Sequence, residues 1–589
     1  MSEVVNTFLV DDHRISGITD QTNVAVKKGP ATTTIQKYKQ TSNTSSNVMF
    51  QVAVPTENIL CDRAIRINTK LRCTITLTSA LAEAQVITVV PSSFPLNTGL
   101  QSASARINNA KLEVSSSDVV ETIKKQYNQR YLSKYCQMTP SLVDTYFGII
   151  DDASEDIFPN SYMNGAKYGG NDDTSGRADC KISFLAYNAL GAAIAPVDGT
   201  VTIPVANSNG AYIDVTIDVS ENILGLPTFE IKSEESAYLG INNLELNLQL
   251  NDCKRSVYMG MTENNRAVTY SIAPGIKFPA NVSSNFLSDE SYIVMNYLSL
   301  HPSDYAKMSV KNVIPFNEFT SYRQLSTRTS DSVGSLGSFS VQGNTISMRQ
   351  IPDKIFVYVG VPPERRPIGV SNHLNFPITG LKIDFNNRSN LMAELDQRDL
   401  YALSRRNGSN QTYPEFSGTV RGQDGQIYCS LGSVIVIDPT RDLSLDDYLA
   451  AGSLGTFSFQ ITAYCDNYSV IRPNRTTLAA QSDVQLNVIA SYAGVLVTQQ
   501  GVSVSQSGLL TKSLVLDTKE KGTAVGDYEA VAELQGGNVG RSLSGLGDAL
   551  KKRGVGMVKS QAKSAIDSAV NGLGGHYNYS AGSRLSKYT

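Results

Sequence analysis

Residues that could perform chemistry are few in this chain, and their spacing favours no reaction. A nucleophilic triad requires a histidine, yet the four histidines (His13, His301, His373 and His576) lack informative neighbours. Asp11-Asp12-His13 could form one corner of a metal site, but in a polar N-terminal segment a solvated loop is the simpler interpretation. The sequence therefore predicts no catalytic, cofactor-binding or metal-binding residues, and a protein that is not an enzyme.

The cysteine and glycine patterns support the same conclusion. The seven cysteines are odd in number and scattered, without a CxxC pair, at positions 61, 73, 136, 180, 253, 429 and 465. This pattern predicts reduced thiols in an intracellular protein and no zinc site. The chain has no phosphate-binding GxxxxGK[ST] loop, and Gly545-Leu546-Gly547 lacks the third glycine of a dinucleotide fingerprint.

Composition indicates a folded protein rich in strands. The 589 residues are 41% hydrophobic and only 18% charged, below the roughly 25% of charged residues in typical soluble domains. Ser, Thr, Asn and Gln take the place of charges, a mixture that suits strands and turns. No apolar run reaches membrane-spanning length and the N-terminus has no signal-peptide core, so we expect a soluble protein made inside a cell.

Hydrophobic alternation with a period of two recurs from about residue 48 to 507. Leu71, Cys73, Ile75 and Leu77 alternate with polar residues, and the run from Leu244 to Leu250 alternates without a fault. Helical patterns are restricted to a segment capped by Asp118 and a second segment around residues 391–405. Helices this sparse predict an antiparallel β-sandwich class.

The pattern divides the chain into four parts. Residues 1–45 are polar and predict an N-terminal arm, and residues 46–262 form a first series of strands. A seam rich in proline and glycine lies near residues 257–279. Residues 263–507 form a linker and a second series of strands, which begins near Tyr292. Residues 508–589 form a Gly/Ser-rich basic tail.

The tail carries most of the charge asymmetry. Residues 538–589 contain eight basic and two acidic residues, a net charge of +6 that leaves −9 on the rest of the chain. Five of the basic residues lie in one segment with helical spacing: Lys551, Lys552, Arg553, Lys559 and Lys563. Such a helix suits weak electrostatic contact with genome phosphates or a membrane surface, although a solvated end is an equal alternative.

Several short motifs together resemble the double jelly-roll major capsid proteins of virophages and polinton-like viruses. Each is an ordinary strand, turn or helix, and their order and spacing over residues 45–505 carry the resemblance. In the first half the motifs are Phe94-Pro95-Leu96, Arg106-Ile107-Asn108-Asn109, the helix from Asp118, and the segment 139–144. In the second half they are the segments 351–359, 378–387, 400–401, 410–416 and 455–461.

The resemblance implies an all-β fold of two side-by-side antiparallel eight-stranded jelly rolls with few short helices. It also implies a homotrimer of pseudo-hexagonal outline that tiles an icosahedral DNA-virus shell, because three subunits with two sandwiches each give six. The implied partners are further copies of the chain, penton and minor capsid proteins. The implied location is the virion, after synthesis in the host cytoplasm.

The tail also contains a segment similar to the site cut by adenovirus-type cysteine proteases. This segment is Leu534-Gln535-Gly536-Gly537, followed by Asn538. Paired glycines leave the backbone narrow enough to enter a protease groove. Cleavage after Gly537 by a viral maturation protease would release the basic tail. Chance occurrence in a glycine-rich tail is the alternative for this motif.

For the whole protein, the alternative is a multi-domain β-sandwich binding protein of lectin-like or fibre type.

Overall fold

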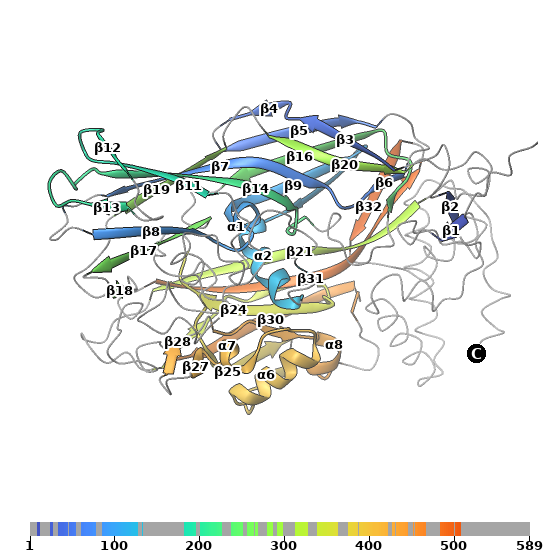
Figure 1. The fold of residues 1–589 in the computed structure, drawn as a ribbon. Coiled ribbons are helices and arrows are strands. Elements are labelled where there is room, and N and C mark those ends of the chain that lie inside the picture. The colour runs from blue at the N-terminus through green and yellow to red at the C-terminus, as the bar shows by residue number, and fades with distance from the viewer. Residues whose placement is uncertain are drawn as a thin grey trace, which may run out of the picture.

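The fold is that of a computed structural model, which describes part of the chain. The described residues are 9–11, 24–26, 33–44, 46–54, 60–77, 80, 85–127, 132, 182–195, 201–226, 237–250, 256–263, 266–268, 280–286, 291–298, 312–327, 338–362, 375–386, 388–421, 427–429, 432–445, 451–452, 454–466, 483–499 and 501–507. Strands dominate them, and every strand pairing is antiparallel. Two sandwiches lie one above the other in Figure 1, with β21 and β31 crossing the middle of the molecule.

The second half forms one sandwich of two sheets. One sheet has the order β21 (Asn312–Thr327), β31 (Asp483–Gln499), β24 (Lys354–Gly360) and β29 (Ile435–Ile437). The facing sheet has β22 (Phe339–Gln342) and β23 (Ile346–Gln350) end to end along β30 (Leu454–Cys465), then β25 (Ile378–Phe385) and β26 (Arg388–Leu391). With β22 and β23 counted as one strand, this is the eight-stranded order of a jelly roll.

The first half repeats this order with one change. Its first sheet has β5 (Asn47–Ala53), β16 (Asn243–Leu250), β9 (Leu100–Ile107) and β10 (Ala110–Val114), with β4 (Ser42–Asn43) beside β5. Its second sheet runs from β7 (Arg66–Leu77) through β14 (Tyr212–Asn222) and β11 (Ile182–Tyr187) to β12 (Ala193–Ile194). The change concerns the strand at the end of the first sheet. In the first half this strand is β10, which follows β9 directly in the chain. In the second half it is β29, which comes later in the chain than β25 and β26.

Strands near the predicted seam belong to the first half. A strand does begin at Tyr292, but this strand, β20 (Tyr292–Leu298), pairs with β7, and β19 (Ala280–Phe286) also pairs with β7. The end of the predicted arm contributes as well, because β3 (Thr33–Lys39) pairs along the whole of β20. The division of the chain at residue 262 stays a prediction, and these pairings place residues 280–286 and 292–298 in a sheet of the first half.

The remaining elements are short and lie around the two sandwiches. One small ladder of the first half pairs β1 (Leu9–Asp11) with β2 (Val24–Val26). Another has the order β13 (Val201–Ile203), β8 (Gln85–Pro91), β17 (Val257–Glu263) and β18 (Arg266–Val268). Further strands are β6 (Leu60–Asp62), β15 (Ala237–Tyr238), β27 (Thr419–Arg421), β28 (Ile427–Cys429) and β32 (Val502–Ser507). The helices are α1 (Pro95–Gly99), α2 (Ser116–Gln126), α6 (Gln397–Arg406), α7 (Tyr413–Phe416) and α8 (Pro439–Asp442). Among the described residues, no helix is long and apolar enough to span a membrane.

The alternating segments form strands with one buried face, as predicted. In β7 and β16 every second residue is buried, because successive side chains of a strand point to opposite sides of the sheet. The thiols of Cys61, Cys73 and Cys465 are buried in these cores. The two sandwiches have separate cores, and the first extends onto the second-half sheet through Phe316, Phe356 and Tyr358.

Both predicted helices exist, and their first residues differ from the prediction. Helix α2 is preceded by Ser115 as its N-cap, so Asp118 lies within the first turn and is not the capping residue. Helix α6 begins at Gln397 rather than near Leu391, because Asp396 accepts hydrogen bonds from the backbone N–H groups of Arg398 and Asp399 and completes a capping box with Asp399.

Candidate functional site at the junction of the two jelly rolls

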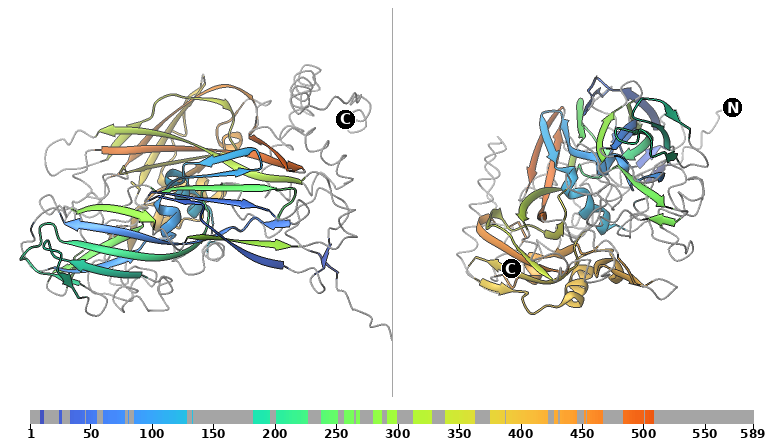
Figure 2. Two further views of the ribbon diagram at one scale, coloured as in Figure 1. Left: turned by 90° about the horizontal axis from the view of Figure 1, so that it is seen from above. Right: turned by 90° about the vertical axis from the view of Figure 1, so that its left-hand side faces the viewer.

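The described part of the chain contains no cluster of three or more His, Cys, Asp or Glu side chains able to hold a metal ion. All four histidines fall outside the described residues. The proposed cleavage segment, Leu534 to Asn538, and the five basic residues from Lys551 to Lys563 also lie outside them. The most developed polar arrangement in the described structure is the junction between the two jelly rolls, where helix α2 lies between them (Figure 2).

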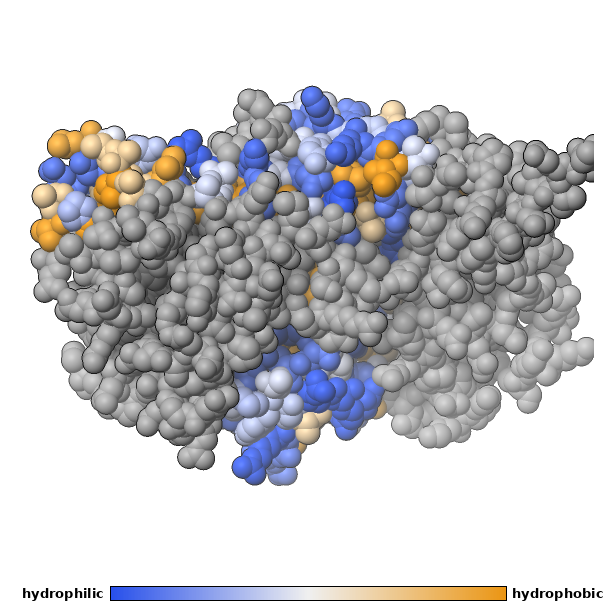
Figure 3. Space-filling model, in the orientation of Figure 1, coloured by the Kyte–Doolittle hydropathy of each residue, from blue (hydrophilic) through white to orange (hydrophobic). Residues whose placement is uncertain are grey.

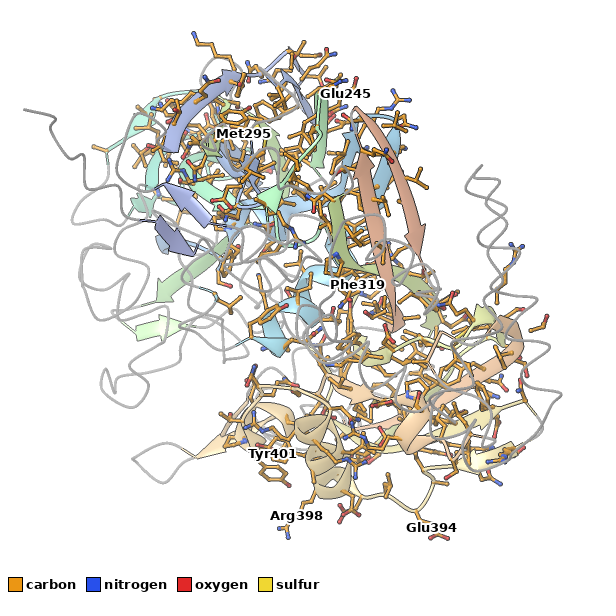
Figure 4. The ribbon with its side chains drawn as sticks, turned by 90° about the vertical axis from the view of Figure 1, so that its right-hand side faces the viewer. Glu245, Met295, Phe319, Glu394, Arg398 and Tyr401 are labelled. Atoms are coloured by element: carbon orange, nitrogen blue, oxygen red, sulfur yellow. The ribbon has the colours of Figure 1, made fainter. Side chains whose placement is uncertain are left out.

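One sheet of the second jelly roll is buried on both faces at this junction. Along β24, Ile355, Val357 and Val359 pack into the core of the second jelly roll. Phe356 points the other way, into the core that the first jelly roll dominates, and so does Phe319 of β21. Figure 4 shows Phe319 between the two sandwiches, whereas Tyr401 and Arg398 lie on the outer side of the second. The two jelly rolls therefore share an apolar contact.

The N-terminal end of α2 is bonded to the second jelly roll by Asp118. Its Oδ2 accepts hydrogen bonds from Ser321 Oγ at 2.8 Å and from Arg323 Nε at 2.6 Å, both on β21. The backbone carbonyl of Asp118 accepts a third bond, from the Tyr358 hydroxyl, at 3.0 Å. The Asp118 side chain is 3% exposed and that of Arg323 is 44% exposed, so the ion pair lies at the rim of the junction.

The C-terminal end of α2 carries a second ion pair to the same jelly roll. Lys125 Nζ contacts Glu415 Oε1 of α7, and the two side chains are 4% and 10% exposed. Asn410 donates from its backbone N–H to the Lys125 carbonyl at 2.7 Å and from its side chain to the Gln126 carbonyl. The helix is thus attached to the second jelly roll at both ends, by contacts that join residues more than two hundred positions apart.

Beneath α2, two buried charges hold the short helix α1. Glu221 of β14 accepts hydrogen bonds from the backbone N–H groups of Leu96 and Asn97, each at 3.1 Å, and from Asn97 Nδ2 at 2.7 Å. Lys124 of α2 donates to Ser93 O at 3.0 Å and to Thr98 Oγ1 at 2.7 Å. Burial raises the pKa of Glu221, and this effect is opposed by the donors of Asn97 and Leu96 and by the charge of Lys124.

A third contact joins the turn between β9 and β10 to the last described strand, β32. Asn108, in the left-handed region at φ 51°, donates from Nδ2 to Ser503 Oγ at 2.9 Å. Asn109 Oδ1 accepts from the Ser503 backbone N–H at 2.7 Å. We call this set of bonds among Asn108, Asn109 and Ser503 the asparagine clasp. It fixes the strand from which the basic tail continues.

Sequence reasoning named Asp118 and both asparagines only as parts of weak motifs, and it gave no role to Lys125, Glu221 or Glu415. One available signal was the unbroken apolar run Ile355-Phe356-Val357-Tyr358-Val359, which is typical of a strand buried on both faces. The ion pairs had no such signal, because their partners are distant in the chain.

Comparisons with known proteins agree with this architecture. The model of the first domain of the Sputnik virophage major capsid protein matches residues 4–298, half of the chain. The model of the C-terminal domain of major capsid protein V20 matches residues 322–494. The capsid protein V20 of Sputnik virophage is 21% identical over 542 residues, which cover 87% of this chain and 82% of that protein.

Solved structures share the fold. A chain of the Sputnik virophage structure determined by cryo-EM has a TM-score of 0.64 at 16% identity, covering 90% of this chain and 98% of that one. The crystal structure of the mavirus major capsid protein has a TM-score of 0.58 at 15% identity, covering 82% and 92%. Two jelly rolls joined through α2, matched along both halves by these models, place the chain in the family of virophage major capsid proteins, which are structural rather than catalytic.

Proposed function

We propose that this major capsid protein assembles as a homotrimer of pseudo-hexagonal outline, and that these trimers tile an icosahedral shell. The observation that carries the proposal is the fixed pairing of two sandwiches within one chain, through a shared apolar contact and two ion pairs. Three chains then supply six similar units around a three-fold axis, the arrangement a near-hexagonal tile requires.

Light scattering coupled to size-exclusion chromatography tests this proposal on the full chain. We expect a mass three times the monomer mass of 63.7 kDa, and images of the assembled particle showing tiles of pseudo-hexagonal outline. A persistent monomer at high concentration would contradict trimerisation. Penton and minor capsid proteins are proposed as further partners in the virion, after synthesis of the chain in the host cytoplasm.

We also propose that a viral maturation cysteine protease cleaves after Gly537 and releases the basic tail. The support is the Leu534-Gln535-Gly536-Gly537 motif and its position beyond β32, the last described strand. Before cleavage the +6 tail would make weak electrostatic contact with the genome or a membrane. The intact mass of the chain from mature particles tests cleavage: a chain ending at Gly537 is expected, and a full-length chain refutes it.

A further inference from the structure

Two neighbouring turns at one end of the first jelly roll contain no charged residue. The segments 182–195 and 201–213 lack Asp, Glu, Lys, Arg and His, in a chain that is 18% charged; Asp198, in the connection between them, lies outside the described residues. They include β12 and β13, which lie at the left end of the molecule in Figure 1, while β32 lies at the right. We call residues 185–195 and 203–211 the neutral tip.

The neutral tip exposes large apolar side chains. Leu190 is 78% exposed, Leu185 53% and Val205 45%, and the small side chains of Ala189, Ala192 and Ala193 are exposed beside them. Figure 3 shows apolar surface gathered at this end. A single exposed leucine is ordinary on a protein surface, whereas several exposed apolar side chains within two neighbouring uncharged turns are typical of an interface core.

Hydrogen bonds within the tip fix its shape. Asn188 Oδ1 accepts from the backbone N–H groups of Leu190 at 3.0 Å and Ala192 at 2.9 Å, and Gly191 N–H donates to the Asn188 carbonyl at 2.9 Å. The two turns are joined to each other by a bond from Ala189 N–H to the Asn207 carbonyl at 3.0 Å. A contact made by this tip therefore requires little ordering of the backbone, which favours binding.

Charged residues begin again directly behind the tip. Tyr187 and Tyr212 stack with ring centroids 4.8 Å apart, and the next residues along the sheet include the Arg72–Asp214 ion pair. Thr74 Oγ1 also donates to Asp214, at 2.6 Å. Asp214 is the cross-strand partner of Leu185, so the uncharged surface ends at Leu185.

We propose that the neutral tip is a contact surface between copies of this chain. A partner of opposite charge is disfavoured because the tip has no charge to complement, and an anionic lipid surface or nucleic acid requires the basic residues that the tip lacks. A second copy meets no like-charge repulsion there, and subunits of a capsid must contact further copies. This inference rests on the proposed self-assembly and assigns part of that contact to named residues.

The test places a charge at the centre of the tip in the full-length chain. Leu190→Glu and Leu190→Lys, measured by analytical ultracentrifugation over a concentration series, are each expected to raise the concentration needed for assembly about tenfold or more, because a charge buried without a partner opposes association. Leu325→Glu is the matched control, since Leu325 is 59% exposed on β21 of the second jelly roll. Circular dichroism checks that each variant folds, and Leu190→Gln, which adds no charge, provides a milder second variant expected to weaken assembly less.

The outcomes separate this inference from the proposed trimer. Assembly of Leu190→Glu at the wild-type concentration overturns the inference and leaves the trimer intact, and equal loss in Leu325→Glu also overturns it. Binding of the wild type, but not Leu190→Glu, to phosphatidylcholine vesicles would make the occupant a lipid and overturn it. If the wild type forms no trimer, the proposed function fails. The inference about the tip then holds only if the wild type still self-associates with rising concentration and Leu190→Glu abolishes that self-association.

Discussion

The two jelly rolls share one strand order but differ in what is added to it. The second contains its eight strands with short helices on the outside, α6 among them. The first adds α1 and α2 within its chain path, and it receives β19 and β20 beside β7, with β3 paired to β20. Most of the helical and ionic contacts that join the halves come from these additions, because α2 supplies both ion pairs.

This difference assigns distinct roles to the two halves. The second presents a sheet whose strand β24 is buried on both faces, and the first presents a helix that lies against that sheet. The two sandwiches are thus joined by insertions of the first copy, α2 above all, together with α7 of the second, which supplies Glu415. Three changes test how far the joining of the two halves depends on each kind of contact.

The largest effect is expected from Phe356→Ala, at the apolar contact. Phenylalanine-to-alanine changes in a packed core reduce the free energy of unfolding by about 3–5 kcal/mol. Because Phe356 packs into the core of the first half, we expect faster hydrogen exchange in β16 as well as in β24. The neighbouring change Ile355→Ala, which affects only the second core, is the control. Identical exchange in β16 for the two variants would show that the shared contact carries no coupling.

A smaller effect is expected from Lys125→Met, which leaves the carboxylate of Glu415 buried without its cation. Breaking a buried ion pair in this way costs about 3 kcal/mol, measurable as a lower unfolding midpoint in urea. The double variant Lys125→Met/Glu415→Gln should recover most of that loss. Lys111→Met, in a pair whose side chains are 64% and 56% exposed, is the control, with an expected change below about 0.5 kcal/mol. A loss as large in the control would remove the distinction between buried and exposed pairs.

The smallest effect is a change in pH dependence from Glu221→Gln. The pKa of Glu221 is raised on folding, so the folded state retains a proton that the unfolded state has lost. Its contribution to stability is therefore present at acid pH and is lost as the pH rises from 4.5 through the folded pKa. The difference in thermal midpoint between wild type and variant should shift in favour of the variant across that range. Parallel curves for the two proteins would contradict this assignment.

The strands could be predicted from the sequence better than their partners could. Alternation along β7 and β16 indicated which residues face the cores, and the apolar run of β24 carried the signal of a doubly buried strand. Asp118 was expected to cap α2, but its carboxylate instead bonds to Ser321 and Arg323. Local spacing cannot predict such contacts, because packing of distant segments decides them. The same reason explains why β20, although its first residue was predicted, pairs with the first half.

The asparagine clasp has a mechanical consequence. The strand β32 pairs with β31 from Val502 opposite Gln499 to Ser507 opposite Gly494, so a pull on the tail opens this ladder from its Ser507 end, one pair after another. At Ser503 the pull meets the bonds from Asn108 and Asn109 in addition to the ladder. Tension applied beyond Ser507 is thereby transferred to the β9–β10 turn of the first jelly roll, and the load is spread over both halves.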